Sequence, residues 1–134
     1  MVEQKIIDEL LTRGTVDVIV RDDLEKKLKS GKKLRVKLGI DPTGSRLHIG
    51  RGVVLRKLRK FQDAGHQIVL IIGDFTGIVG DASDKDCERP RLTLEKVKEN
   101  MKTYLPQIGR ILNVEKCEIR YNSEWLGKLN FAEI

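Results

Sequence analysis

The chain has 134 residues and a net charge of +6, from 26 Lys and Arg against 20 Asp and Glu; this length suits one domain with a core and excludes two. The longest apolar stretch, residues 68–72, is too short to cross a membrane and no targeting leader is visible, so we expect a cytoplasmic protein without a membrane partner. The positive charge suits a polyanionic partner such as nucleic acid or a nucleotide, and a solvated basic surface explains it equally well.

The first 31 residues are predicted to form a helical arm. Residues 16–20 alternate weakly between apolar and polar and suit a short extended segment. A second helix over residues 22–30 begins with two aspartates, which favour a helix N-terminus, and Gly31 closes it. A first helix is predicted over residues 3–11, because four apolar residues share one face: Ile6, Ile7, Leu10 and Leu11.

From residue 34 onward the pattern predicts strands that alternate with helices. Residues 34–40 form a predicted strand, and residues 67–72 form a second strand whose apolar run is typical of burial on both faces. The helix between them, residues 49–64, turns a basic face outward: Arg56, Lys57, Arg59 and Lys60. Its predicted buried face consists of Val54, Leu55, Leu58 and Phe61.

The same alternation continues to the end of the chain. A polar connection over residues 73–90 precedes a long helix over residues 94–112, which Pro106 is expected to kink or break. Residues 117–121 are a third predicted strand, and residues 123–134 begin another helical region. The order βαβαβ predicts an α/β fold, the first half of a doubly wound parallel nucleotide-binding sheet, preceded by N-terminal helices. The predicted inward residues of the long helix are Val97, Met101, Leu105 and either Ile108 or Ile111.

The segment after the first strand has the chemistry of a phosphate site. Asp41 follows that strand, and ligands of open α/β sheets bind beyond the carboxyl ends of the strands. The next helix begins near His48, and the free N–H groups of a helix start suit phosphate. Gly50 lets a base or a phosphate approach the backbone. Thr43 and His48 supply neutral donors for a terminal phosphate oxygen.

Other motifs are absent or ambiguous. Neither GxxxxGK[ST] nor GxGxxG occurs, so this is not a Walker loop or a dinucleotide fingerprint. His48 by itself is more often a helix cap or a packing residue than a ligand-binding residue. Cys87 and Cys117 lie too far apart for a zinc motif, so we predict no metal site in the protein itself.

Longer segments carry a family resemblance. DPTGSRLHIG, residues 41–50, resembles the first signature of class I aminoacyl-tRNA synthetases. RKLRKFQDAGHQIVLIIGDFTGIVGD, residues 56–81, and RYNSEWLGKLNF, residues 120–131, resemble the tyrosyl-tRNA synthetases. The resemblance implies a Rossmann-like, HIGH-type catalytic domain over residues 32–134, with residues 1–31 as the arm. It also implies activation of tyrosine with ATP and Mg²⁺, transfer of tyrosine to tRNA, and a homodimer for the full-length enzyme.

The resemblance assigns ATP-site roles residue by residue. Thr43 and His48 would hold the γ-phosphate as the transition state forms, so both are candidate catalytic residues. Gly39 and Asp41 would line the adenylate cleft, and Gly50 would lie under the adenine. Arg51, which follows Gly50 in the signature, would also belong to the ATP site.

A second set of roles falls mainly on the cluster at residues 80–89. Asp81 would bind the α-ammonium group of tyrosine, since a carboxylate is the natural partner of that cation. Lys85 and Arg89 match mobile-loop cations that bind pyrophosphate, although a solvated polar loop explains them too. Lys37 occupies a position where some family members direct a tyrosine toward the substrate phenol.

The chain also departs from the family pattern. The signature His-Ile-Gly-His ends here in Arg51, which is longer and permanently charged. The DPSGK-like loop becomes Asp81-Ala82-Ser83-Asp84-Lys85, and the second signature, KMSKS, is absent. We therefore expect an N-terminal piece of a tyrosine–tRNA ligase. The alternatives are a non-catalytic nucleotide- or tRNA-binding module and, with less support, another nucleotidyltransferase.

Overall fold

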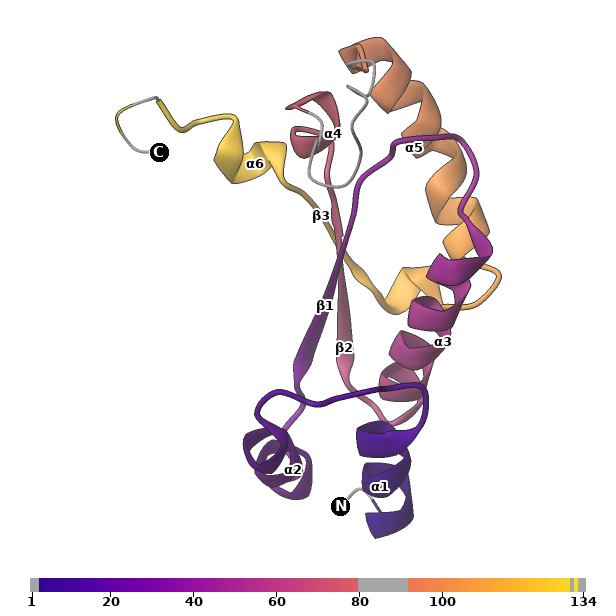
Figure 1. Cartoon of the computed structure of the whole chain (residues 1–134), viewed down its shortest axis with the longest axis vertical. Coiled ribbons are helices and arrows are strands. Elements are labelled where there is room, and N and C mark those ends of the chain that lie inside the picture. Colours follow the sequence, from indigo (N-terminus) through magenta and orange to yellow (C-terminus); the bar gives the residue numbers. More distant parts are fainter. Residues whose placement is uncertain (1–2, 80–91, 131, 133–134) are drawn as a thin grey trace.

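The computed structural model describes residues 3–79, 92–130 and 132, and shows a small parallel sheet with helices along one side and at both ends (Figure 1). The elements in chain order are α1 (Gln4–Thr12), α2 (Arg21–Lys29), β1 (Arg35–Ile40), α3 (Ile49–Asp63), β2 (Gln67–Ile72), α4 (Thr76–Val79), α5 (Leu94–Ile108), a 3₁₀ turn η1 (Val114–Lys116), β3 (Glu118–Tyr121) and α6 (Ser123–Leu126).

The sheet confirms the predicted βαβαβ order. Its strands lie in the order β1-β2-β3 and both pairings are parallel, with Leu38 opposite Leu70 and Leu70 opposite Ile119. Helices α3 and α5 lie on the same side of the sheet (Figure 1). All three strands therefore end at one edge, where the candidate loop begins.

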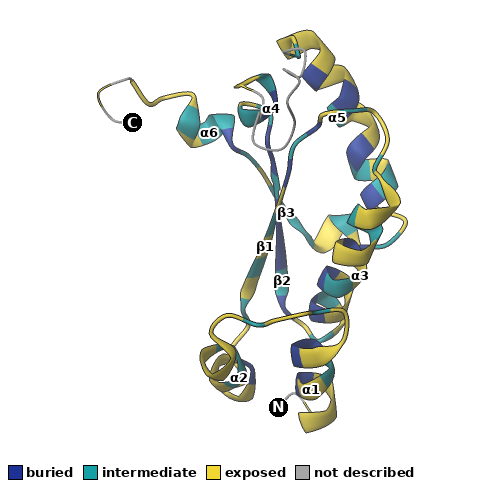
Figure 2. Ribbon diagram, in the orientation of Figure 1, coloured by how far each residue is buried: buried dark blue, intermediate teal, exposed yellow. Residues whose placement is uncertain are grey.

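One hydrophobic core joins the sheet, the two crossover helices and the N-terminal arm. The central strand β2 is the most buried (Figure 2). Its Ile68 and Leu70 are fully enclosed. Helix α1 contributes Ile7, Leu10 and Leu11, and α2 contributes Leu28. The opposite face of β1 stays open, since Arg35, Lys37 and Gly39 are exposed there.

Two predicted helix faces need correction. On α3, Leu55, Leu58 and Phe61 are buried as predicted, but Val54 is 44% exposed because it lies on the flank of the helix that faces away from the core. Lys57 is half-buried and not simply solvated: its Nζ donates to the carbonyl oxygens of Leu10 (2.6 Å) and Arg13 (2.8 Å) at the end of α1. On α1, Ile6 is exposed instead of buried.

Helix α5 differs most from its prediction. It continues through Pro106 and ends at Ile108, so the proline does not break it and lies in its last turn. Val97 and Ile108 are buried as predicted, and Met101 and Leu105 are half-buried. The fully buried positions between them belong to Asn100 and Tyr104, which the apolar pattern did not indicate.

Two shorter segments also differ. Residues 16–20 form no strand, and Val16, Ile19 and Val20 are exposed. Helix α6 ends at Leu126 and residues 127–130 are not helical, so the predicted continuation is wrong over that stretch.

In the part of the chain that the structure describes, no helix has the length and apolar character to span a bilayer.

Candidate nucleotide-binding site

A hydrogen-bonded triad links the carboxyl ends of the three strands. The Thr76 hydroxyl donates to Oδ1 of Asp41 at 2.6 Å and accepts a hydrogen bond from Nδ2 of Asn122 at 2.8 Å. Asn122 is buried, and its Oδ1 accepts from the backbone N–H of Phe75 at 2.9 Å. Asp41 follows β1, Thr76 begins α4 after β2, and Asn122 follows β3. The carboxylate of Asp41 is therefore oriented by Thr76, and Thr76 is in turn held by Asn122.

Gly73 makes this arrangement possible. A Cβ atom at position 73 would lie 1.8 Å from Oδ1 of Asp41 and 2.5 Å from Oγ1 of Thr76. The backbone N–H of Gly73 donates to the carbonyl of Ile40 at 2.9 Å, so the backbone here is fixed against the end of β1. A side chain of any size would displace the Asp41 carboxylate.

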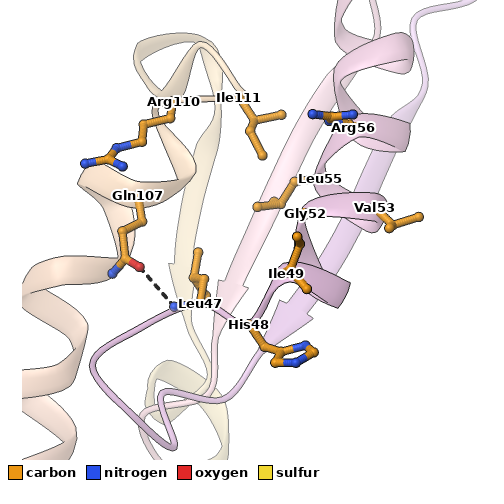
Figure 3. Close-up of a pocket in the computed structure, with 10 residues that line it drawn as sticks. All are labelled: Leu47, His48, Ile49, Gly52, Val53, Leu55, Arg56, Gln107, Arg110 and Ile111. Atoms are coloured by element: carbon orange, nitrogen blue, oxygen red, sulfur yellow. Dashed lines mark hydrogen bonds between the residues drawn. The ribbon is translucent and has the colours of Figure 1, made fainter.

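Helix α5 holds the loop from the helix side. Thr103 Oγ1 donates to the carbonyl of Ser45 at 2.6 Å, and Gln107 Nε2 donates to the same carbonyl at 2.9 Å. Gln107 Oε1 accepts from the backbone N–H of Leu47 at 2.9 Å (Figure 3). These bonds satisfy backbone groups of an irregular loop, which would otherwise need water. They also fix the backbone that leads into the start of α3.

Two buried residues of α5 contact the beginning of the loop. Asn100 Nδ2 donates to the carbonyl of Pro42 at 2.9 Å, and the Tyr104 hydroxyl donates to the carbonyl of Asp41 at 3.4 Å. Burial raises the pKa of the Tyr104 phenol, and the nearby positive charge of Arg51 acts in the opposite direction. Arg51 is half-buried, so its charge lies at the loop and not far out in solvent.

His48 is the N-cap of α3. Its Nδ1 accepts a hydrogen bond from the backbone N–H of Gly50 at 3.1 Å, so this nitrogen carries no proton and the imidazole can donate only from Nε2. A Cβ atom at position 50 would lie 3.2 Å from Nδ1, so the glycine leaves room for the cap. The capping interpretation is therefore confirmed, and it leaves the exposed Nε2–H available as a donor.

A pocket of about 480 Å³ lies between α3 and α5 (Figure 3). Leu47, Leu55 and Ile111 point toward its centre, which is apolar. The pocket is on the helix side of the loop, and His48 is the only residue it shares with the predicted ATP site; Asp41 and Thr43 do not line it. Its complete lining is Leu47, His48, Ile49, Gly52, Val53, Leu55, Arg56, Gln107, Arg110 and Ile111.

Of the remaining predicted site residues, some are exposed in the structure and the others lie outside the described residues. Thr43 is exposed on the loop, and Gly39 and Lys37 are exposed on the open face of β1. Asp81, Lys85 and Arg89 lie outside the described residues. Gly39 has nothing within 4 Å of a Cβ atom placed on it, so the surface beside the strand end is open.

Sequence reasoning missed the residues that position the loop. One signal for them was available: polar or hydroxyl-bearing residues recur at helical spacing on α5, at Asn100, Thr103, Tyr104 and Gln107. No comparable local signal marked Thr76 or Asn122. In the described ranges, no three His, Cys, Asp or Glu side chains come together in a way that could hold a metal ion.

The three-stranded parallel sheet with its preceding helices has the Rossmann-like fold of class I synthetase catalytic domains. A C-terminally truncated mitochondrial tyrosyl-tRNA synthetase of Aspergillus nidulans has this fold, with a TM-score of 0.76 and 21% identity over 98% of this chain and 41% of that one. The Archaeoglobus fulgidus tyrosyl-tRNA synthetase solved with L-tyrosine has a TM-score of 0.73 and 21% identity over 96% of this chain and 37% of that one.

Sequence similarity shows the family as well as the fold. The profile of the family described as tRNA synthetases class I (W and Y) matches residues 29–134, so the chain belongs to that family. The tyrosine–tRNA ligase of Thermotoga maritima is 51% identical over 126 residues, covering 94% of this chain and 31% of the relative. That of Chlorobaculum tepidum is 49% identical over 130 residues, covering 94% and 32%. The chain thus spans about a third of the length of these relatives.

Proposed function

We propose that this chain supplies one half of the ATP site of a tyrosine–tRNA ligase. The observation that carries the proposal is the fixed approach to α3, where His48 caps the helix through Nδ1 and leaves Nε2–H free. A second support is the Asp41 carboxylate, which Thr76 holds at the adjoining strand end. The relatives at about half identity all bear the name tyrosine–tRNA ligase, which favours this function over a non-catalytic module.

The reaction has two balanced steps. A carboxylate oxygen of tyrosine attacks the α-phosphorus of ATP, the bond to the bridging oxygen breaks, and pyrophosphate leaves. A hydroxyl at the end of tRNA then attacks the tyrosyl carbonyl, AMP leaves with the electron pair of the acyl–oxygen bond, and the hydroxyl proton passes to the departing phosphate or to water. Both steps depend on positioning and on stabilising charge on phosphate oxygens more than on proton transfer.

The proposed roles follow from this chemistry. His48 Nε2–H and the Thr43 hydroxyl donate to the γ-phosphate, and the helix start at Gly50 faces the nucleotide. Gly39 lines the cleft beside Asp41, since its missing side chain leaves the strand end open. The half-buried Arg51 adds a positive charge near the phosphates, where other family members have histidine.

Four further residues would complete the site. Asp81 would bind the ammonium group of tyrosine, and Lys85 and Arg89 would bind pyrophosphate. Lys37, on the open face of β1, would lie beside the tyrosine side chain. Mg²⁺ would enter with ATP and take most of its ligands from phosphate and water. We further propose that the full-length enzyme is a cytoplasmic homodimer, with residues 1–31 as an arm beside the catalytic unit of residues 32–134.

Titration with ATP tests the nucleotide half directly. We expect weak, saturable binding that shifts the backbone amide NMR signals of Gly50 and Arg51. His48→Ala should weaken this binding by roughly tenfold, the scale of one charge-assisted hydrogen bond. Lys128→Ala, an exposed control near the end of the chain, should leave binding unchanged. Equal binding by wild type and His48→Ala would contradict the role of the helix start.

Tyrosine specificity needs a separate assay. We expect ATP–pyrophosphate exchange in the presence of tyrosine, at a low rate for this chain alone, because the chain lacks the second signature. Exchange that depends on tryptophan and not on tyrosine would overturn the substrate assignment.

A further inference from the structure

Lysines are concentrated at the end of the sheet opposite the nucleotide loop. Helix α2 ends at Lys29 and β1 begins at Arg35; residues 26–33 contain five lysines and no acidic residue. All five lysines are exposed. Figure 1 places α2 beside the amino end of β1, whereas Asp41 follows the carboxyl end of that strand.

Four of these lysines form what we call the basic patch: Lys26, Lys27, Lys32 and Lys33. Lys29 is excluded because its Nζ pairs with Glu25 at 2.6 Å. Within residues 3–79, 92–130 and 132, the ammonium groups of the patch lysines make no hydrogen bond or ion pair; Lys27 and Lys32 bond to the Ser30 hydroxyl only through their backbone. The acidic residues of α2 lie in its first half, at Asp22, Asp23 and Glu25, and none of them pairs with the patch.

The patch belongs to a folded surface and not to a loose tail. Leu28, between Lys27 and Lys29, is completely buried in the hydrophobic core, and Leu24 packs against that core from the preceding turn. Gly31 has a φ of 70°, a left-handed conformation that turns the chain from α2 toward β1. The lysines on both sides of the turn are therefore held on one rigid corner of the molecule, which lowers the entropic cost of binding an extended polyanion.

We propose that the basic patch binds the phosphate backbone of RNA. Lysine ammonium groups bind phosphates as point charges without reading sequence, and each neutralised phosphate releases counterions. A protein partner is disfavoured because lysine is depleted in protein–protein interfaces. A membrane surface is disfavoured because the segment that carries the patch, residues 26–33, has no exposed large apolar side chain; the exposed Ile19 and Val20 precede the opposite end of α2. The choice of RNA over DNA rests on the proposed function.

Fluorescence anisotropy of a short labelled RNA hairpin tests the proposal. The patch variant is Lys26→Gln, Lys27→Gln, Lys32→Gln and Lys33→Gln combined. The control carries four substitutions at exposed lysines elsewhere: Lys5→Gln, Lys98→Gln, Lys102→Gln and Lys128→Gln. Each variant loses four positive charges, which lowers the net charge from +6 to +2. Circular dichroism and thermal melting would establish that both variants are folded.

The patch variant should bind the hairpin at least about tenfold more weakly between about 50 and 200 mM salt. Its slope of log K against log salt should be shallower by about three, as expected when four phosphate contacts are lost. The control should keep most of the wild-type affinity and slope. Equal losses in both variants would mean that only net charge matters and would overturn the proposal, as would an unchanged patch variant.

Two parallel measurements separate the sources of anionic groups. Tighter binding of a DNA hairpin of the same sequence would overturn the choice of RNA. Tighter binding of phosphatidylserine vesicles, lost only in the patch variant, would identify a membrane surface and overturn the proposal. The assays contain no ATP or tyrosine, so a negative result leaves the ATP-site proposal intact. A failure of ATP binding would remove only the reason for choosing RNA over DNA, which the DNA hairpin tests directly.

Discussion

The hydroxyl of Thr76 donates a 2.6 Å hydrogen bond to the carboxylate of Asp41, and this bond joins the carboxyl ends of β1 and β2. It requires the close approach that Gly73 permits, because Gly73 has no side chain between the two groups. The orientation of Asp41 is thus set by residues more than thirty positions away in the chain, and not by the loop that contains it.

Gly73→Ala should therefore damage both stability and nucleotide binding. The new methyl group would meet Asp41 Oδ1 at 1.8 Å, and relieving this clash should cost about 1–3 kcal/mol of unfolding free energy, the usual range for overpacking. Urea denaturation gives the stability, and ATP titration gives the binding. Gly39→Ala is the matched control for stability, since nothing lies within 4 Å of a Cβ atom there. A Gly73→Ala variant as stable as Gly39→Ala would show that the network adjusts without cost.

Gln107→Leu should loosen the loop before α3. The change removes the donor to the Ser45 carbonyl and the acceptor of the Leu47 N–H, so about 1 kcal/mol of stability should be lost for each bond. Hydrogen exchange of the Leu47 amide should speed up, and ATP should bind more weakly. Arg110→Leu, in the turn that follows α5 and without a side-chain hydrogen bond in the described part of the chain, is the control. Unchanged exchange at Leu47 would contradict a positioning role for Gln107.

The strands could be predicted because the apolar pattern that indicates each strand lies within the strand itself. The apolar run at 67–72 gave the bounds of β2, and the alternation of strands with helices predicted the parallel order. The side chains that fix the loop were not predictable in the same way. The buried position of Asn100 is tolerated because its amide donates a hydrogen bond to the Pro42 carbonyl, fifty-eight residues earlier. Apolar periodicity in the sequence cannot reveal such a bond. The roles of Thr43 and Lys37 stay predictions, since they depend on ligands and on family resemblance.

His66 should make stability depend on pH. Its ring is buried and packs against Phe61, its Nδ1 accepts from the Leu34 N–H at 3.3 Å, and burial lowers the pKa of the imidazole. The unfolded chain then binds a proton more readily than the folded one. The stabilising contribution is therefore complete above about pH 6.5 and declines as the pH falls below that value. Urea denaturation at several pH values should show this decline in wild type.

The variant His66→Gln isolates that contribution from the titration of carboxylates. It keeps an acceptor near Leu34 but cannot gain a charge in this range. The difference in unfolding free energy between wild type and variant should shrink as the pH falls below about 6.5. A difference that stays constant with pH would mean that His66 is protonated equally in both states.

Lys57→Met should release the end of α1. Nζ of Lys57 donates to the carbonyls of Leu10 and Arg13, which are among the last acceptors of that helix and have no following turn to bond them. Burial lowers the pKa of this amine, but the two short bonds hold the ammonium in place. Methionine keeps the aliphatic packing and removes the donors, so we expect a loss of roughly 1–2 kcal/mol in urea denaturation, discounted for partial exposure.

The control is Arg56→Met. Arg56 is next to Lys57 but exposed and without such a bond in the described structure, so this change should alter stability by less than about 0.5 kcal/mol. Similar losses in the two variants would show that the cap contributes nothing beyond general charge, and that α1 is held by its other contacts: the buried Ile7, Leu10 and Leu11 and the Glu9–Lys60 ion pair.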